Sequence, residues 1–416
     1  RFISDVQPGE DGGYVITLVT AAGETSTITI SDGESVTLEN ILIGDVWVCS
    51  GQSNMEMPVK GFGNQPVENS IDYIMRAGEE ASRIRMFTVQ RARSYDKDME
   101  DCAGGQWECA SPASVANCSA TAYFFAYNLT HAVNIPIGII ATDWGGTRVE
   151  SWMPLSALKD CVTEEQFKQK QTVHDIKPSE LYCAMIAPIR NFTARGFLWY
   201  QGEANLGDID HYDKMMARMV EQWRSDWGDE DNSMPFYYAQ IAPYSYGDSQ
   251  NISYPLFVEA QVRALSEIPN CGMAGTTDIG SENCIHPAQK FEVGQRLAAL
   301  ALMQTYGQSG FEPRAPRMES YEIRDGKVTV RLLRAGLGLT PWYGEPIKGF
   351  EIAGSDRVFH KANASISGNS VTLWSDEVKE PVAVRYAFRN YIENNLHNMF
   401  GVPAVPFRTD DWNDVR

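Results

Sequence analysis

The sequence predicts an α/β protein in which a mostly parallel sheet is covered by helices, with β-rich segments at both ends. Residues 44–308 alternate short apolar runs with amphipathic stretches, a pattern typical of strands joined by crossover helices. Residues 1–43 and 309–416 instead carry short alternating runs bounded by turn residues. A chain of 416 residues also suits two or three domains. We therefore expect three domains with boundaries near residues 44 and 309.

The expected elements follow from local patterns along the chain. Strands in the N-terminal segment are expected at 13–19 and 26–30, where β-formers alternate around turns. In the α/β region, apolar runs predict strands at 46–49, 84–89, 136–142, 196–200, 235–241 and 272–277. Apolar residues at helical spacing predict helices at 120–133, 210–227 and 287–306, and Pro287 suits the first turn of the last one. The C-terminal strands, expected at 321–323, 327–332, 349–352, 370–374 and 382–386, favour a sandwich or partial jelly roll.

Composition and charge exclude several classes of protein. The net charge of −19 disfavours nucleic acid or an anionic membrane as a partner. No apolar run reaches membrane-spanning length, and six histidines without ligand spacing predict no metal site. The eight cysteines form no C-x-x-C pair, although Cys102, Cys109 and Cys118 lie close enough in sequence for a disulfide bridge. The chain begins at Arg1 without a signal-like start, so we expect any targeting segment to have been removed or omitted.

The first chemical candidate is Ser53. It follows the buried strand 46–49 in the tight polar turn Ser50-Gly51-Gln52-Ser53-Asn54. The carboxyl end of a parallel strand opens into the crevice where α/β sheets bind ligands. A hydroxyl there is a candidate nucleophile, although a polar turn alone explains an isolated G-x-S as well.

Three further segments carry groups suited to the same chemistry. The Gly145-Gly146 turn offers unshielded backbone N–H groups, as an oxyanion hole requires. Gln201 and Asn205 follow strand 196–200 and offer side-chain amides as oxyanion donors. His286 precedes the last helix, where its imidazole can reach the sheet edge as a general base. Each residue also has a purely structural explanation, but their recurrence at successive strand ends favours a site.

Five blocks of the sequence resemble the sialate O-acetylesterase family of the SGNH-hydrolase superfamily. They are LIGDVWVCSGQSNMEM (42–57), IGIIATDWGGTRVESW (137–152), LYCAMIAP (181–188), FLWYQGEAN (197–205) and IHPAQKFEVGQRLAAL (285–300). The tail NLHNMFGVPAVPFRTD (395–410) is similar to the family's closing segment. The resemblance covers nearly the whole chain from about residue 10.

The resemblance implies a flavodoxin-like, three-layer SGNH-hydrolase domain at 44–308 with accessory β-rich segments at 1–43 and 309–416. It implies hydrolysis of acetyl esters on carbohydrates without a cofactor, and a secreted, periplasmic or lysosomal location. Ser53 is then the nucleophile and His286 the base. The oxyanion donors implied are the amide of Ser53, an amide of Gly145 or Gly146, and a side chain of the block that contains Gln201 and Asn205.

Two positions depart from the family pattern. Cys284 stands where the family usually has Asp, and Cys183 where Asn is common. The first departure removes the acid expected to orient His286, because a free thiol near pKa 8.5 is mostly neutral. The sequence leaves open which group orients the imidazole. The candidates are Cys284, Asn283, Glu282, Asp278 and Glu203.

Specificity is expected to come from the sugar, because acetyl is small. Trp144, Trp152 and Tyr244 are candidate sugar contacts. Arg148 is a candidate partner for a sialic acid carboxylate, with an ion pair to Glu150 or another acid as the favoured alternative.

Three functions follow from these features. The first is a carbohydrate O-acetylesterase acting on acetylated sialic acids, or alternatively on acetylxylan or other plant glycans. The second is a weakly active or inactive glycan-binding protein. The third is an esterase with a broader acyl pocket, which the lack of an evident apolar lid disfavours.

Overall fold

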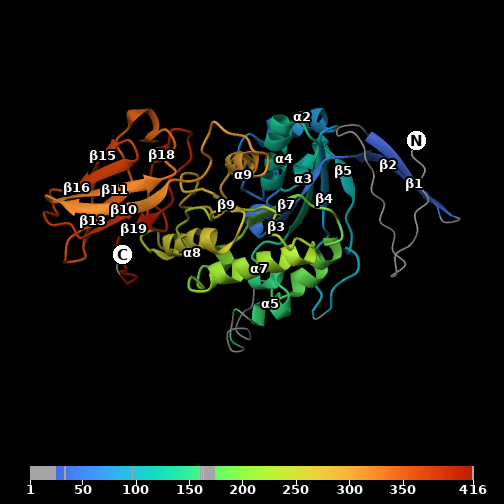
Figure 1. The fold of residues 1–416 in the computed structure, drawn as a ribbon, viewed down its shortest axis with the longest axis horizontal. Coiled ribbons are helices and arrows are strands. Elements are labelled where there is room, and N and C mark those ends of the chain that lie inside the picture. Colours follow the sequence, from blue (N-terminus) through green and yellow to red (C-terminus); the bar gives the residue numbers. More distant parts are fainter. Residues whose placement is uncertain are drawn as a thin grey trace.

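The chain has a central α/β region flanked by a β-hairpin at one end and a β-rich region at the other (Figure 1). The computed structural model describes residues 25–31, 34–95, 97–159, 161, 163 and 174–414. The hairpin pairs β1 (Thr25–Ser31) with β2 (Ser35–Leu42) in antiparallel fashion. The strand expected at 13–19 lies outside the described residues.

The central sheet has seven strands in the order β5-β4-β6-β3-β7-β8-β9. Their bounds are β3 Asp45–Gly51, β4 Ile84–Thr88, β5 Trp107–Cys109, β6 Ile137–Asp143, β7 Gly196–Tyr200, β8 Phe236–Ala239 and β9 Cys271–Ala274. All neighbouring pairs are parallel except β4 and β5. The predicted mostly parallel sheet is therefore confirmed, with one antiparallel edge strand.

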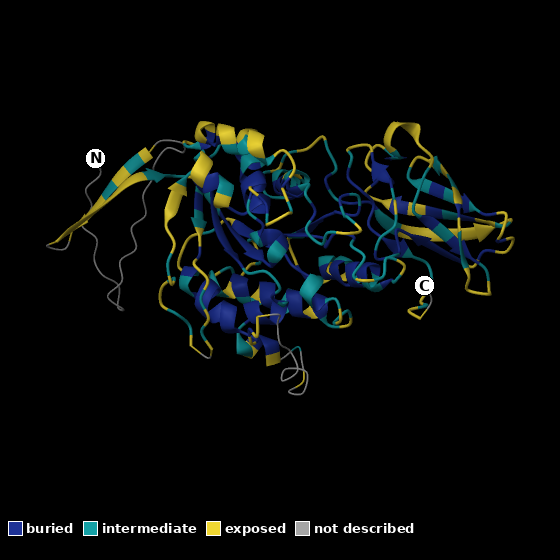
Figure 2. Cartoon of the chain, turned by 180° about the vertical axis from the view of Figure 1, so that it is seen from behind, coloured by how far each residue is buried: buried dark blue, intermediate teal, exposed yellow. Residues whose placement is uncertain are grey.

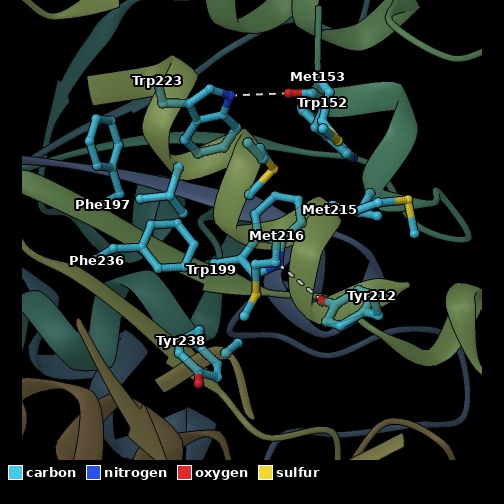
Figure 3. Packing of buried hydrophobic residues seen from close by; sticks show 14 of the residues in the cluster. Trp152, Met153, Phe197, Trp199, Tyr212, Met215, Met216, Trp223, Phe236 and Tyr238 are labelled. Carbon is cyan, nitrogen blue, oxygen red and sulfur yellow. Dashed lines mark hydrogen bonds between the residues drawn. The ribbon is translucent and has the colours of Figure 1, made fainter. Parts of the chain in front are cut away.

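Successive residues of β3 belong to two different core clusters. Trp47 and Cys49 pack with helices α4 (Ala120–Val133) and α9 (Lys290–Gln304), whereas Val48 packs with α7 (Tyr212–Asp226) and α8 (Ser253–Glu267). Side chains alternate across a strand, so each face of the sheet carries its own helix layer. Figure 2 shows the buried residues along the middle of this region, and Figure 3 shows the aromatic packing of the α7 side.

Shorter helical segments connect these elements. They are α1 (Ser53–Glu56), α2 (Ser70–Arg76), η1 (Ala77–Glu80), α3 (Pro112–Asn117), η2 (Val149–Trp152), α5 (Leu155–Lys159), η3 (Tyr182–Ile186), η4 (Ala187–Ile189), η5 (Glu203–Asn205) and η6 (Trp342–Gly344). The prediction for α4 agrees with the structure at both ends, where Ser119 caps the first turn by accepting from Ala122 N. The last helix begins at Lys290 and not at Pro287, so that prediction was wrong by three residues.

The C-terminal region is built from short antiparallel strands around its own apolar core. One sheet has the order β10-β11-β16-β15, a second has β14-β13-β17-β19, and β12 pairs with β18. The bounds are β10 Arg317–Arg324, β11 Lys327–Leu333, β12 Leu339–Thr340, β13 Phe350–Ala353, β14 Phe359–Lys361, β15 Asn363–Ser367, β16 Ser370–Trp374, β17 Ala383–Tyr386, β18 His397–Asn398 and β19 Phe407–Arg408. The β-rich character expected for this region is confirmed, while the domain boundaries at 44 and 309 remain a prediction.

Polar contacts join this region to the α/β region. Asn390 Oδ1 accepts from Tyr254 N at the start of α8, and Arg408 forms a two-nitrogen ion pair with Glu259 on the same helix. These contacts hold the C-terminal strands beside the loops that follow β8 and β9.

Candidate active site

Ser53 lies where β3 ends, in a turn attached to both neighbouring strands. Gln52 N donates to Tyr200 O at the end of β7, and Trp144 N beyond β6 donates to Gly51 O. Gly51 has φ +145°, and a Cβ atom there would lie 2.2 Å from Tyr200 O. The turn therefore needs glycine at position 51, and it presents Ser53 at the surface, whereas Ser50 is fully buried.

The structure brings Ser53 and His286 together from positions 233 residues apart. Ser53 Oγ lies 2.8 Å from His286 Nε2, and both residues are partly exposed. A hydroxyl in hydrogen-bond contact with an imidazole is the geometry of an activated nucleophile.

The other ring nitrogen contacts a residue that the sequence analysis missed. His286 Nδ1 lies 2.7 Å from Gln65 Oε1. A carbonyl oxygen can only accept, so in the neutral ring Nδ1 carries the proton and Nε2 is free to accept from Ser53. No motif marked Gln65; its one signal was its place twelve residues after Ser53 in a Gly-rich turn.

The structure pairs three of the groups proposed to orient His286 with other atoms. Cys284 Sγ donates to the backbone oxygen of His286 and not to its ring. Asp278 binds Arg296 through both oxygens, 2.7 Å each. Glu203 Oε1 accepts from the side chain of Asn54.

The remaining two, Glu282 and Asn283, are exposed. In the described part of the chain, the histidine–acid pairs within 4.0 Å involve His131, His360 and His397. His286 therefore has no carboxylate partner among the described residues.

The surroundings of His286 keep its ring neutral. Burial first, and then the nearby Lys290 ammonium, lower the pKa of His286 to about 4, while Glu56 acts in the opposite direction. The imidazole is therefore in its basic form at neutral pH.

A buried polar group lies behind the nucleophile. Asn54 accepts from Lys290 Nζ and donates to Glu203 and to Ile285 O, so it connects the Ser53 turn with the His286 loop. Burial lowers the pKa of the Lys290 ammonium to about 7 and raises the pKa of Glu203. These contacts place Ser53 and His286 relative to each other.

The amides of Gln201 and Asn205 do not face a reacting group. Both side chains are fully buried. Gln201 Nε2 donates to Thr147 O and to Asn205 Oδ1, and Asn205 Nδ2 donates to Glu150 Oε2 at 2.9 Å. The structure thus contradicts the expected donor role of both, because their N–H groups are already used inside the protein.

The glycine turn beyond β6 lies against the nucleophile. A Cβ atom on Gly145 would lie 3.2 Å from Ser53 Cβ and 2.8 Å from Glu56 Oε2, so only glycine fits there without a shift. Gly145 N donates to Glu56 Oε2, and Arg91 pairs with the other oxygen of the same carboxylate. Gly146 follows with φ +71°. The backbone amides of this turn are therefore the groups nearest to Ser53 that suit an oxyanion.

A cleft of about 370 Å³ opens beside these residues. Its lining includes Glu56, Phe62, Arg91 and the end of β6 at Asp143. Phe62 also packs edge-on against the His286 ring, with centroids 5.2 Å apart, so the cleft adjoins the dyad. A larger cavity of about 490 Å³ lies between β2 and the sheet edge and contains neither Ser53 nor His286.

The candidate sugar contacts divide into exposed and buried residues. Trp144 is partly exposed, with the Arg91 guanidinium 5.2 Å from its ring centroid, and Tyr244 is also partly exposed. Trp152 is fully buried in the α7-side core, where its backbone oxygen accepts from Trp223 (Figure 3). The prediction for Trp152 was wrong, because the apolar face of its short helix packs inward.

Arg148 is engaged by protein groups on all sides of its guanidinium. It pairs with Glu150 and Asp208 and donates to Ala204 O. The structure therefore agrees with the ion-pair alternative for Arg148, because two carboxylates and a backbone oxygen already bind its guanidinium.

No group of three metal-ligating side chains occurs among the residues that the structure describes. Over the same residues, no helix is both long and apolar enough to cross a bilayer. Cys102, Cys109 and Cys118, all described, carry free thiols, so the disulfide considered for them is absent.

Comparisons with known proteins point to one family. Residues 43–303, more than half of the chain, match the family model described as carbohydrate esterase, sialic acid-specific acetylesterase. The sialate O-acetylesterase of Pongo abelii is 29% identical over 412 residues, covering 89% of this chain and 76% of its own. The human enzyme of the same name is 28% identical over 312 residues, covering 69% of this chain but only 58% of its own.

A solved structure extends the likeness to the whole fold. A carbohydrate acetylesterase from Xanthomonas citri is 33% identical, with a TM-score of 0.86, and the match covers 97% of this chain and 89% of that one. The chain therefore belongs to the carbohydrate esterase family of sialic acid-specific acetylesterases, which makes it a carboxylic ester hydrolase.

Proposed function

We propose that this chain removes O-acetyl groups from carbohydrates through an acetyl-enzyme on Ser53. The observation that carries the proposal is the 2.8 Å contact between Ser53 Oγ and His286 Nε2. The 370 Å³ cleft lies nearby, since Phe62 lines it and packs against the His286 ring. A hydroxyl is a weak nucleophile until an adjacent base takes its proton.

The reaction then proceeds in two steps. His286 accepts the Ser53 proton as the oxygen attacks the acetyl carbonyl, and it returns that proton to the sugar hydroxyl that leaves. Water, activated by the same imidazole, then releases acetate from Ser53.

Backbone amides stabilise the oxyanion of both tetrahedral intermediates in this proposal. Ser53 N–H is one of the first amides of α1, which intrahelical bonds do not use. The second donor is the amide of Gly146, or that of Gly145 once the substrate oxygen replaces the Glu56 carboxylate. Preorganised donors of this kind are usually worth about 3–4 kcal/mol each in the transition state.

We propose acetylated sialic acids as the substrate class, with Arg91 as the residue that binds the carboxylate. Unlike Arg148, Arg91 lines the cleft, and its side chain is 41% exposed. Acetylated xylan and other plant glycans are the alternative substrates, since the Xanthomonas citri relative is described only as a carbohydrate acetylesterase.

Acetate release from acetylated sialosides, xylans and pectins tests the substrate class. We expect sialosides to give the highest kcat/KM. Arg91→Ala should raise KM for sialosides and leave KM for neutral acetyl sugars unchanged. Arg93 lies outside the cleft lining, so Arg93→Ala serves as the control. A preference for xylan that Arg91→Ala does not alter would contradict the sialate assignment.

Substrate range also tests the class of enzyme. A chromogenic acetate ester should react far faster than a longer acyl ester, because the proposed substrates carry acetyl groups. No hydrolysis of any ester would favour a glycan-binding protein. A secreted, periplasmic or lysosomal location remains a proposal, which cell fractionation would test.

A further inference from the structure

His286 is held by one loop that supplies both a ring contact and a hydrogen bond. Residues Phe62 and Gln65 close a tight turn through reciprocal backbone bonds of 3.0 and 3.1 Å. Asn64 inside this turn has φ 60°, a left-handed conformation that Asn tolerates. The Phe62 ring packs edge-on against the imidazole at 5.2 Å, and the Gln65 amide reaches Nδ1 at 2.7 Å.

The loop is itself attached to the His286 segment. Glu68 N donates to Ala288 O at 2.9 Å, two residues beyond the histidine. Gln65 is half-buried, so its hydrogen bond is partly shielded from water. The imidazole is therefore positioned by Phe62 and Gln65 on one side and by Ser53 on the other.

We propose that Gln65 is the positioning residue of the catalytic histidine, a neutral amide that replaces the acid of a Ser-His-acid arrangement. The proposal rests on the proposed Ser53–His286 mechanism. Its support is the Nδ1–Oε1 contact, together with the absence of a carboxylate within 4.0 Å of the His286 ring among the described residues. A carbonyl acceptor at Nδ1 selects the tautomer that leaves Nε2 basic.

A neutral partner changes how the site responds to pH. A carboxylate at Nδ1 favours the imidazolium. With a neutral amide at Nδ1, the protonation of the ring depends on the other charged groups around it. Those groups are Lys290 on α9, Glu56 on α1, Glu203 behind Asn54 and the Cys284 thiol in the same loop. Burial and Lys290 lower the pKa of His286 to about 4, so the enzyme should stay active well below pH 6.

The test compares Gln65→Ala, Gln65→Glu and the control Asn64→Gly, which keeps the turn and does not touch His286. We expect Gln65→Ala to lower kcat by about 10²-fold with little change in KM, as loss of an oriented base does. Gln65→Glu should restore kcat at pH 8 and move the acid limb of the kcat–pH profile upward by about one to three pH units. Asn64→Gly should match the wild type.

A second measurement does not depend on activity. The Cε1–H resonance of His286, assigned by its loss in His286→Ala, should titrate near pH 4 in the wild type and at a higher pH in Gln65→Glu. This readout applies even where Gln65→Ala fails to fold.

The outcomes separate the two proposals. If Gln65→Ala keeps wild-type kcat, or if Gln65→Glu moves neither the acid limb nor the His286 resonance, Gln65 does not position the imidazole. If His286→Ala itself keeps full activity, the Ser53–His286 mechanism fails, whatever Gln65 does.

Discussion

β3, which leads to Ser53, lies between β6 and β7 in the sheet. Different kinds of polar structure follow these two neighbouring strands. Beyond β7, Gln201 and Asn205 are fully buried and bind Thr147 O, Glu150 and each other. Beyond β6, Gly145 lies against Ser53 and donates to the carboxylate of Glu56, which lines a cleft. Both ends follow a parallel strand, and the sequence made both candidates for the oxyanion hole.

The difference shows that polarity at a strand end does not by itself make a site. A buried amide whose N–H groups all have protein acceptors stabilises the fold. Breaking its hydrogen bonds costs free energy, because the acceptors are left buried without a partner. A backbone amide at an open cleft can exchange its partner for a substrate oxygen. We therefore assign stability to the β7 side and chemistry to the β6 side.

The largest effect is expected at Ser53, where the two sides meet. Ser53→Ala removes the attacking oxygen and should lower kcat by about 10⁴–10⁶, with unfolding unchanged. A serine-directed phosphonate should label the wild type at Ser53 only. Ser50→Ala, in the buried part of β3, is the control and should keep its activity. Labelling at Ser50 would instead identify Ser50 as the nucleophile.

Gly145→Ala tests the β6 side. The added Cβ would press on Ser53 Cβ at 3.2 Å and on Glu56 Oε2 at 2.8 Å, so the turn must shift. We expect kcat to fall by about 10²–10³, as for loss of one oxyanion donor, with little change in the unfolding midpoint. Gly207→Ala on the β7 side is the control, because a Cβ there meets nothing within 4 Å. It should leave kcat unchanged.

Gln201→Ala tests the β7 side with the opposite expectation. It removes the buried hydrogen bonds that the Gln201 side chain makes to Thr147 O, Asn205 Oδ1 and the Tyr212 hydroxyl. The free energy of unfolding, measured by denaturant titration, should fall by about 2–3 kcal/mol, while kcat per folded molecule changes less than tenfold. A 10²-fold loss of kcat at unchanged stability would instead show that Gln201 donates to the oxyanion.

The smallest effect concerns Asp143, the buried carboxyl at the end of β6. Burial, and then Glu56, raise the pKa of Asp143 to about 7 from 3.8. Because this pKa is raised, the contribution of Asp143 to stability is fully present below about pH 4 and is lost as pH rises through 7. Asp143→Asn should therefore be more stable than the wild type by about 1–3 kcal/mol at pH 8, and the gain should shrink toward pH 4. An equal gain at both pH values would mean that ionisation is not the cause.

Much of the fold could be predicted because periodicity and turns encode burial locally. The buried strands β3 and β7 follow from apolar runs, and the bounds of α4 from apolar residues at helical spacing. Helix α8 went unpredicted, although it carries seven buried residues. The start of α9 was misplaced because residues 287–289 serve the His286 loop and do not extend the helix.

For the site, the proposed reacting pair could be predicted from the sequence, since Ser53 and His286 stand at a strand end and a helix entry that an α/β sheet brings to one edge. The surroundings of the two residues became visible only in three dimensions. Gln65 lies 221 residues from His286 and is neutral, so neither spacing nor charge could mark it. The burial of Gln201, Asn205 and Trp152 was equally hidden, because a linear pattern shows which residues are polar or aromatic, while three-dimensional packing determines which of them already have partners.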